Sequence, residues 1–357
     1  MEKTFQIEHP IDNLNINAHG SLEKVNNTIA KSQSVVKQST YTVISYFAGC
    51  GGLDLGFAGD FEVFNSYLPS TGFQIVKAYD FEERCIITYK ANISEHIEQK
   101  DIFALSVNDV PKADVLIGGF PCQDFSSCGP QRGLSSSRGQ LYLSMIDYMK
   151  RHSPKVVVGE NVPHLAKMQQ GRVLQTILRD LSQTGYKVKL WDLYAPDYGV
   201  PQTRRRLFFI CVRPDLDGFP EEPIPEFQKD SGYRSIEWAI DDLKKIDDET
   251  VSNQSQYFRA SKAKKGNGQG DEKSKRNQPA YTVRANAKSR VQFHYELERR
   301  LTVRECARLQ SFPDTFVFPH SATTNIMQIG NAVPPLLAHK VATSIANFLL
   351  ESDDNGK

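Results

Sequence analysis

Short, uninterrupted runs of apolar residues recur along the chain and stop at glycine or at an acidic residue. Runs of this kind are typical of strands whose two faces are both buried. The sequence therefore predicts β-strands at residues 40–47, 73–79, 114–119, 155–160 and 207–212.

Apolar positions spaced three or four residues apart lie between these runs. Such stripes at residues 81–89, 141–149 and 173–181 indicate amphipathic helices, the second ending before Pro154 and the third at Gly185. Strands that alternate with helices predict an α/β fold with a doubly wound, mostly parallel sheet. Ligands of such sheets bind beyond the carboxyl ends of the strands.

The pattern changes at both ends of this region. The first residues are polar and rich in Asn, Ser and Lys, which predicts a weakly ordered tail. Beyond residue 214, Pro, Gly, Lys and Asp dominate, and helical order returns where Thr302 and Glu305 predict a capping box. We expect four segments: a tail (1–40), the α/β domain (41–214), a smaller domain (215–317) and a C-terminal segment that returns to the α/β domain (318–357).

Composition adds an asymmetry of charge. The 357 residues carry a net charge of +1, but residues 214–250 hold 12 acidic and 4 basic residues, whereas residues 251–310 hold 14 basic and 5 acidic. The basic block predicts a surface that faces a polyanion, although a solvated surface of mixed charge has the same composition. No apolar run approaches the roughly 18 residues of a membrane span. The amino end lacks the order of a signal peptide, so we expect a cytoplasmic protein with reduced thiols.

The cysteine pattern predicts neither a disulfide nor a metal site. Six cysteines are present, at positions 50, 85, 122, 128, 211 and 306, and none forms a CxxC pair or a zinc-type cluster. Cys122 follows the third predicted strand in "GGFPCQDFSSCGP". It is either a small buried hydrophobic residue or a nucleophile, whose thiolate the cations of "QTRRR" (202–206) would favour.

A glycine-rich turn and two carboxylates lie at strand ends. "FAGCGGLDLGF" is not the dinucleotide fingerprint, because Asp54 replaces the last glycine. With Asp80 after the second strand and Phe81 beside it, the turn predicts a nucleoside site, the alternative being a tight turn with a solvated carboxylate. Glu160 ends a buried strand, so it is either a proton donor with a raised pKa or an arginine partner.

The order of these motifs resembles that of the cytosine-C5 DNA methyltransferases of the bacterial restriction-modification type. The resemblance covers about residues 43–350 and includes "GFPCQDFS", "GENV", "YGVPQTRRRLFFI", "RRLTVRECARLQSFPD" and "QIGNAVPPLLA". It implies a Rossmann-like catalytic and cofactor-binding domain at 41–214 and a DNA target-recognition domain at 215–317.

The resemblance also implies a covalent mechanism on a cytosine that is flipped out of the duplex. The Cys122 thiolate would add to C6, Glu160 would hold a proton at N3, and C5 would accept the methyl group of S-adenosylmethionine, leaving S-adenosylhomocysteine. Arg204 and Arg206 would orient the base, and residues 123–140 would close over it.

The family's other functional residues carry over by position. The cofactor residues would be Phe47, Ala48, Gly49, Cys50, Gly51, Gly52, Asp80, Phe81, Asp101, Ile102, Pro121, Leu141, Asn331 and Ala332, with no metal. The DNA-binding residues would be Gln123, Ser126, Gln202 and Arg284. The implied partner is double-stranded DNA, with a cognate restriction endonuclease acting independently and the methyltransferase itself a monomer.

Three other functions differ from this one in features that the sequence can show. The tRNA-methylating branch of the family shares the catalytic motifs, but it usually carries a Cys-Phe-Thr tripeptide that this sequence lacks. An inactive DNA-binding accessory subunit would not need the complete set of catalytic residues. A nicotinamide oxidoreductase is excluded by the broken glycine fingerprint.

Overall fold

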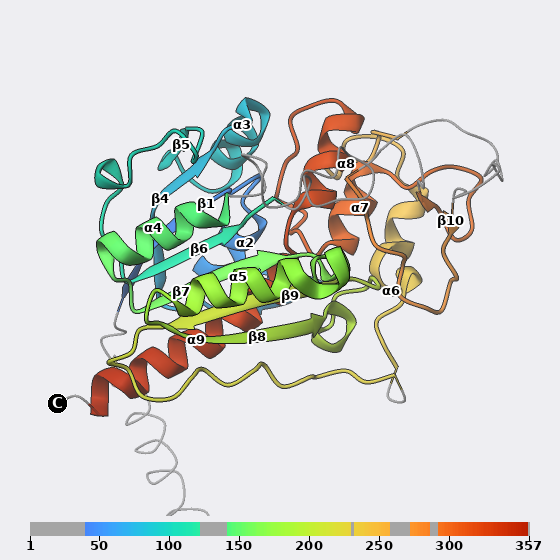
Figure 1. Ribbon diagram of the computed structural model, residues 1–357. Helices are drawn as coiled ribbons and strands as arrows, with labels where there is room; N and C mark the ends of the chain where they lie inside the picture. The colour runs from blue at the N-terminus through green and yellow to red at the C-terminus, as the bar shows by residue number, and fades with distance from the viewer. Residues whose placement is uncertain (1–39, 122–140, 230–231, 258–271, 286–291, 356–357) are drawn as a thin grey trace, which may run out of the picture. The chain divides into compact units, whose positions relative to one another are not determined.

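A seven-stranded sheet is the centre of the part of the chain that the structure describes. The structure is a computed structural model, and it describes residues 40–121, 141–229, 232–257, 272–285 and 292–355 (Figure 1). The strand order is β5-β4-β1-β6-β7-β9-β8. The first five strands in this order run parallel, and β9 is antiparallel to both of its neighbours. The strands are β1 (Tyr41–Tyr46), β4 (Phe73–Asp80), β5 (Ile97–Gln99), β6 (Val115–Gly119), β7 (Val156–Asn161), β8 (Lys187–Tyr194) and β9 (Arg205–Val212).

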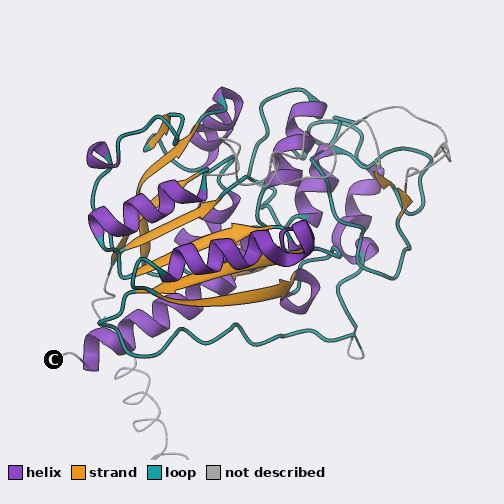
Figure 2. Ribbon diagram, viewed as in Figure 1, coloured by secondary structure: helices purple, strands orange, loops and turns teal. Residues whose placement is uncertain are grey.

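Helices cover both faces of this sheet (Figure 2). Successive residues of a strand point to opposite faces, so Val156 and Val158 enter one apolar cluster and Val157 enters the other. The first cluster contains residues of α2, α3 and α9, and the second contains residues of α4 and α5. These helices are α2 (Gly52–Ala58), α3 (Glu83–Asn92), α4 (Tyr142–His152), α5 (Arg172–Ser182) and α9 (Pro335–Asn355).

The predicted α/β fold class and each of the five predicted strands are confirmed, with ends shifted by one or two residues. Two strands of the sheet were missed, the three-residue β5 and the longer β8. The reason is clear for β8. It alternates polar and apolar residues at the edge of the sheet, with Trp191 and Leu193 buried and Lys189 and Asp192 exposed. A search for continuous apolar runs therefore could not find it.

A third apolar cluster lies around α6 (Ile236–Ile240), α7 (Val303–Leu309) and α8 (Ala322–Asn331). It includes Phe312, Phe316 and Phe318. The remaining elements are short: the hairpin β2 (Phe61–Val63) and β3 (Ser66–Leu68), the paired β10 (Glu272–Lys273) and β11 (Gln292–Phe293), and the 3-10 helices η1 (Val107–Asp109), η5 (Pro163–Gly171), η6 (Ala195–Tyr198) and η7 (Asp241–Lys245). The domain boundaries at 214 and 317 stay a prediction.

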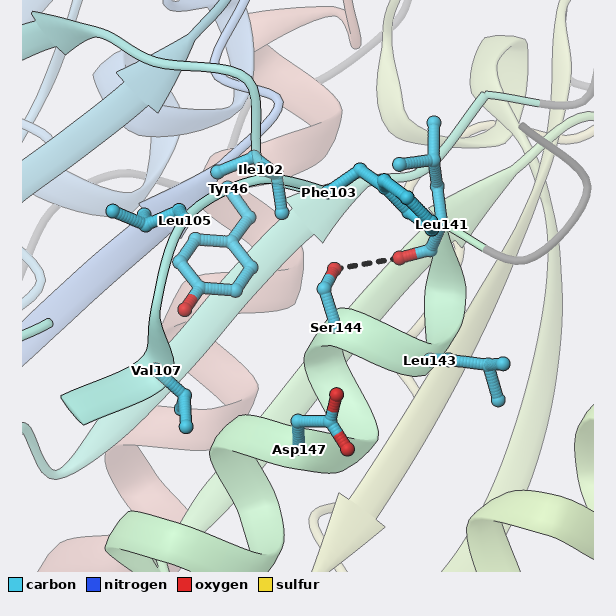
Figure 3. A pocket seen from close by; sticks show the side chains of 9 residues that line it. All are labelled: Tyr46, Ile102, Phe103, Leu105, Val107, Leu141, Leu143, Ser144 and Asp147. Atoms are coloured by element: carbon cyan, nitrogen blue, oxygen red, sulfur yellow. Dashed lines mark hydrogen bonds between the residues drawn. The ribbon is translucent and has the colours of Figure 1, made fainter. Parts of the chain in front are cut away.

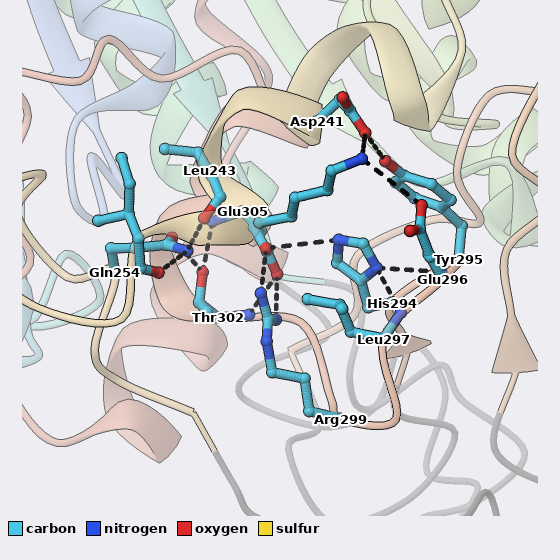
Figure 4. Close-up of polar contacts among 12 residues, drawn as sticks. Asp241, Leu243, Gln254, His294, Tyr295, Glu296, Leu297, Arg299, Thr302 and Glu305 are labelled. Atoms are coloured by element: carbon cyan, nitrogen blue, oxygen red, sulfur yellow. Dashed lines mark hydrogen bonds and ion pairs between the residues drawn. The ribbon is translucent and has the colours of Figure 1, made fainter.

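A buried polar network fixes the start of α7 (Figure 4). The predicted capping box is present, because Thr302 accepts from Glu305 N and Glu305 accepts from Thr302 N, each at 2.9 Å. Arg299 donates two further bonds to the Glu305 carboxylate, at 2.7 and 2.8 Å. His294 accepts from the backbone N–H groups of Glu296 and Leu297 at 3.0 Å, which leaves its other nitrogen facing Glu305 at 3.8 Å.

The basic block that was predicted to face a polyanion contains an arginine that does not lie on the surface. Arg304 is 0% exposed and donates to the carbonyl groups of Ser252, Pro313 and Phe316. For Arg304 the prediction is wrong, because a charged side chain that is buried on carbonyl oxygens has an internal structural role. Among the described helices, none is long and apolar enough to cross a membrane.

Candidate active site

Glu160 lies at the carboxyl end of β7, an interior strand of the sheet. It pairs in register with Gly119 of β6 on one side and with Phe208 of β9 on the other. A side chain at Gly119 would begin 3.0 Å from Glu160 Oε2, so the glycine leaves room for the carboxylate. Asn161 donates to Phe120 O at 2.9 Å and so fixes the segment that leads from β6 to Pro121.

Arg206 is the charged partner of Glu160. Its Nε lies 2.6 Å from Glu160 Oε1, and both side chains are 9% exposed. The contact is an ion pair between opposite charges. Neither Arg206 Nε nor Glu160 Oε1 makes a well-aligned hydrogen bond among the described residues. Burial raises the pKa of Glu160, and the positive charges of Arg206 and Arg204 oppose that rise. Of the two interpretations that the sequence left open, the structure shows Glu160 as an arginine partner. Its role as a proton donor stays a prediction.

Arg204 makes different contacts. It is 1% exposed and donates to Val283 O at 3.1 Å, to Gly330 O at 2.9 Å and to Ala332 O at 2.7 Å. Burial and the neighbouring Arg206 lower its pKa. The guanidinium therefore binds backbone oxygens of three residues, and its predicted contact with a base stays a prediction.

Gln202 is also used inside the protein. It is 0% exposed, donates to Leu309 O at 2.6 Å and to Gln310 Oε1, and accepts from Val283 N at 3.1 Å. These bonds occupy both ends of its amide in this structure. DNA binding by Gln202 stays a prediction.

The glycine-rich turn between β1 and α2 is bonded to the end of β4. Gly49 N donates to Asp80 Oδ2 at 2.8 Å, and Ala48 N donates to Tyr79 O at 3.1 Å. Burial raises the pKa of Asp80, while the N–H groups of Glu82 and Gly49 oppose that rise. Phe47 has a φ of 55°, in the left-handed region that non-glycine residues rarely adopt. Such backbone strain is found most often at functional sites.

The C-terminal segment packs against this turn. A side chain at Gly52 would begin 2.5 Å from Val333 O and 3.0 Å from Ala332 Cβ. Asn331, at the end of α8, is exposed. Cys50 is buried in the apolar cluster of α6 to α8. The structure thus places Ala332 beside the glycine turn although 280 residues of sequence separate Ala332 from Gly52.

A pocket of about 220 Å³ opens between α4 and the segment after β5 (Figure 3). Two of the predicted cofactor residues, Ile102 and Leu141, line it. Asp101 is exposed next to it, and its carboxylate accepts from Phe103 N at 3.0 Å. The ring of Phe81 is exposed, at 65% of its surface. The other lining residues are Tyr46, Phe103, Leu105, Val107, Leu143, Ser144 and Asp147.

Asp54 is a site residue that the sequence did not reveal. Its carboxylate is completely buried under the glycine turn and accepts from Ser45 Oγ at 2.7 Å and from Tyr89 OH at 2.8 Å. Burial raises its pKa to about 6. The missed signal was an acidic residue in the first turn of a helix whose remaining residues are apolar or glycine.

Several predicted residues lie outside the described part of the chain. These are the candidate nucleophile Cys122, the DNA-binding candidates Gln123 and Ser126, and the predicted closing loop at 123–140. Arg284 is described and half-buried, and its Nη1 is buried without a hydrogen-bond partner in the described residues. No group of three or more His, Cys, Asp or Glu that could hold a metal ion occurs among the described residues.

Curated relatives match nearly the whole chain. The Type II methyltransferase M.BsuRI of Bacillus subtilis is 31% identical over 406 residues, which cover 100% of this chain and 89% of that protein. The Type II methyltransferase M.NgoFVII of Neisseria gonorrhoeae is 33% identical over 332 residues, 85% of this chain and 86% of that protein.

Solved structures share the fold. The S. pombe Dnmt2 methyltransferase superimposes with a TM-score of 0.63 at 18% identity, over 87% of this chain and 99% of that chain. This likeness confirms the Rossmann-like methyltransferase fold.

A family model described as C-5 cytosine-specific DNA methylase matches residues 41–347. This match confirms the enzyme class that the sequence predicted, a DNA cytosine-C5 methyltransferase. The chain belongs to the C-5 cytosine-specific DNA methylase family.

Proposed function

We propose that this enzyme methylates C5 of a flipped cytosine in duplex DNA with S-adenosylmethionine as donor, and that Cys122 and Glu160 carry the chemistry. The observation that supports it most is the position of Glu160. This carboxyl group is buried at the carboxyl edge of the sheet, is paired with Arg206 and lies beside the strand that leads to Cys122.

The residues at the carboxyl edge fit S-adenosylmethionine. The exposed ring of Phe81 offers a stacking surface for adenine, and the pocket between Ile102 and Leu141 offers apolar side chains beside polar groups. Asp80 would take the ribose, and Asp101 the adenine amine. The turn at 47–52, Pro121 and the pair Asn331–Ala332 would surround the methionine part. The cofactor supplies an electrophilic methyl group.

Cytosine C5 is a poor nucleophile, so the chain must activate it. The Cys122 thiolate would add to C6, which moves electron density to C5. Glu160 would hold a proton at N3 and so offset the charge that develops on the ring. C5 would then take the methyl group, with S-adenosylhomocysteine as the leaving group. Loss of the C5 proton and elimination of the Cys122 sulfur would free the methylated base and the enzyme.

Two buried arginines beside one buried carboxylate leave an excess of positive charge at this edge. This charge would favour the thiolate form of Cys122. It would also favour the pairing of Glu160 with a base that carries developing negative charge.

Base flipping requires contacts with DNA around the target. Residues 123–140, with Gln123 and Ser126, would close over the extruded base. Arg284 has a donor nitrogen without a partner in the described residues, which fits a contact with DNA.

The relatives suggest the biological context. Because they are Type II methyltransferases, we place this enzyme in a restriction-modification system in which a separate endonuclease cuts unmodified DNA. It would act as a cytoplasmic monomer on chromosomal DNA.

Covalent trapping tests the proposal. A duplex that carries 5-fluorocytosine at the methylated position should form a stable adduct with the enzyme, because fluorine at C5 blocks the final elimination. Bisulfite sequencing of DNA from cells that express the enzyme identifies that position. The adduct should depend on the cofactor and resist denaturing electrophoresis.

Two serine variants, Cys122→Ser and its matched control Cys128→Ser, are compared for adduct formation. The first should abolish the adduct and the second should retain it. An active wild-type preparation that forms no adduct, or an adduct that survives Cys122→Ser, would contradict the covalent role of Cys122.

A further inference from the structure

Three buried polar side chains meet where distant parts of the chain come together. Gln202, Arg204 and Gln310 are each 0 or 1% exposed, and each binds backbone groups of other segments. We call these three residues the buried junction. Since burying polar groups is costly unless they are hydrogen-bonded, the many bonds at this place fix its geometry.

On one side the buried junction holds the end of α8. Arg204 donates to Gly330 O and Ala332 O, and Gln310 donates to Ile329 O at 3.0 Å and to the same Ala332 O at 2.6 Å. Ala332 lies against the glycine turn of the proposed cofactor site. The buried junction therefore contacts the cofactor side of the molecule directly.

On the other side it holds the segment 280–285. Ala280 N donates to Pro201 O at 2.9 Å, and Thr203 N donates to Ala280 O at 2.7 Å, so the two segments run side by side. Val283 then bonds to the buried junction at both backbone groups, its N–H to Gln202 and its carbonyl to Arg204.

Arg284 is held by its backbone immediately after these bonds. A side chain at Gly330 would begin 2.3 Å from both Arg284 C and Ala285 N, so this glycine allows the two segments to touch. The position of Arg284 thus follows from its contacts with Gly330 and from the bonds of Val283.

The strand β9 begins at Arg205, the residue after Arg204, and presents Arg206 to Glu160. Only one residue separates Arg204 from Arg206. We propose that Arg204 is a positioning residue that sets segment 280–285, with Arg284, in register with the Glu160–Arg206 pair, and that it does not contact the target base. This inference rests on the proposed function.

The contacts of residue 204 require the forked, planar guanidinium group of an arginine. Three carbonyl oxygens accept from the two terminal nitrogens of one planar group, a geometry that a lysine ammonium cannot reproduce. Arg204→Lys keeps the positive charge near Glu160 but loses the fork. It therefore separates positioning from electrostatics.

The test is steady-state and single-turnover methyl transfer to a duplex that carries the site mapped by bisulfite sequencing. For Arg204→Lys we expect KM for this duplex to rise about tenfold or more, the effect of losing buried hydrogen bonds. The preference of the enzyme for this duplex over duplexes with one changed base pair should decrease as well. The single-turnover rate at saturating duplex should stay within about threefold of the wild-type rate.

Arg206→Lys is the matched comparison. It should lower the single-turnover rate by about 100-fold and leave KM for the duplex within a few-fold. If Arg204→Lys instead lowers the saturated rate as Arg206→Lys does, with KM and sequence preference unchanged, Arg204 contacts the substrate and the inference is wrong.

A second variant covers the case in which Arg204→Lys does not fold. Thr282 donates its hydroxyl to Thr203 O, and Thr282→Val removes this one bond with little change of shape. We expect a rise of about threefold in KM for the duplex at an unchanged saturated rate. An unchanged KM would contradict the inference. Absence of methyl transfer by the wild-type enzyme would instead contradict the proposed function.

Discussion

The central sheet and the region of α7 and α8 are held together by different kinds of contact. In the sheet, alternate residues of β6, β7 and β9 enter apolar clusters under helices on either face. Around α7 and α8, an apolar cluster is also present, but polar side chains bind the surrounding loops through their backbone oxygens. Asn253, for example, both donates to and accepts from the backbone of Phe318.

This difference has an energetic consequence. Trimming an apolar side chain removes contacts in proportion to its size. Removing a buried polar side chain that binds several backbone groups leaves each of those partners unsatisfied as well, and these costs add. The region of α7 and α8 should therefore be the less tolerant of the two, and the predictions below run from the largest expected effect to the smallest.

Arg304→Met should have the largest effect on stability. It leaves three carbonyl oxygens, two of them in buried bonds, without their charged donor, and we expect the free energy of unfolding to fall by about 3–5 kcal/mol. Urea unfolding measures this fall. Arg205→Met is the control, because Arg205 is half exposed and its pair with Asp192 should contribute at most about 1 kcal/mol. Equal losses in the two variants would contradict the comparison.

Asp54 adds a pH dependence on the cofactor side of the sheet. Its pKa is raised from 3.8 to about 6, so the folded state favours the neutral carboxyl group. Its stabilising contribution is complete below pH 3.8 and is lost as pH rises to about 6. Relative to Asp54→Asn, the wild-type protein should lose roughly 2–3 kcal/mol of unfolding free energy between pH 4 and pH 7. Chemical unfolding of both proteins at each pH measures it, and parallel curves would show that Asp54 does not titrate as described.

Two glycine substitutions compare the regions directly. A side chain at Gly330 would clash with the backbone of Arg284 and Ala285. One at Gly56 of α2 would clash with Pro335 O of α9, in the helices that cover one face of the sheet. Each alanine variant should lose about 1–3 kcal/mol in thermal or urea unfolding. Only Gly330→Ala should also weaken DNA binding, since it displaces Arg284. Equal DNA affinities in both variants would argue against that role of Gly330.

Ile210→Val should have the smallest effect. Ile210 is fully buried in β9, and the loss of one methyl group should cost about 0.5–1.5 kcal/mol without changing DNA binding. A combined measurement of urea unfolding and DNA affinity checks both parts. A larger loss than that of Gly330→Ala would reverse the order of the two regions.

The difference between apolar packing in the sheet and polar contacts around α7 and α8 also explains which features the sequence could predict. The strands could be predicted because a continuous apolar run is a local signal, and Glu160 was found because it ends one such run. The buried junction was not predicted, because Arg204 binds Gly330 across 126 residues of sequence and Gln202 binds Gln310 across 108. Long-range polar pairs leave no periodic trace, and a family motif marks such residues without distinguishing positioning from catalysis.

The central claim is that the buried carboxyl group of Glu160 serves the chemistry, and the pH profile of single-turnover methyl transfer tests it most directly. Because burial raises the pKa of Glu160, the wild-type rate at saturating DNA and cofactor should fall as pH rises through that pKa. Glu160→Gln should be slower by about 100-fold or more and should lack this limb of the profile. A Glu160→Gln enzyme that keeps the wild-type rate and the same pH dependence would contradict the account.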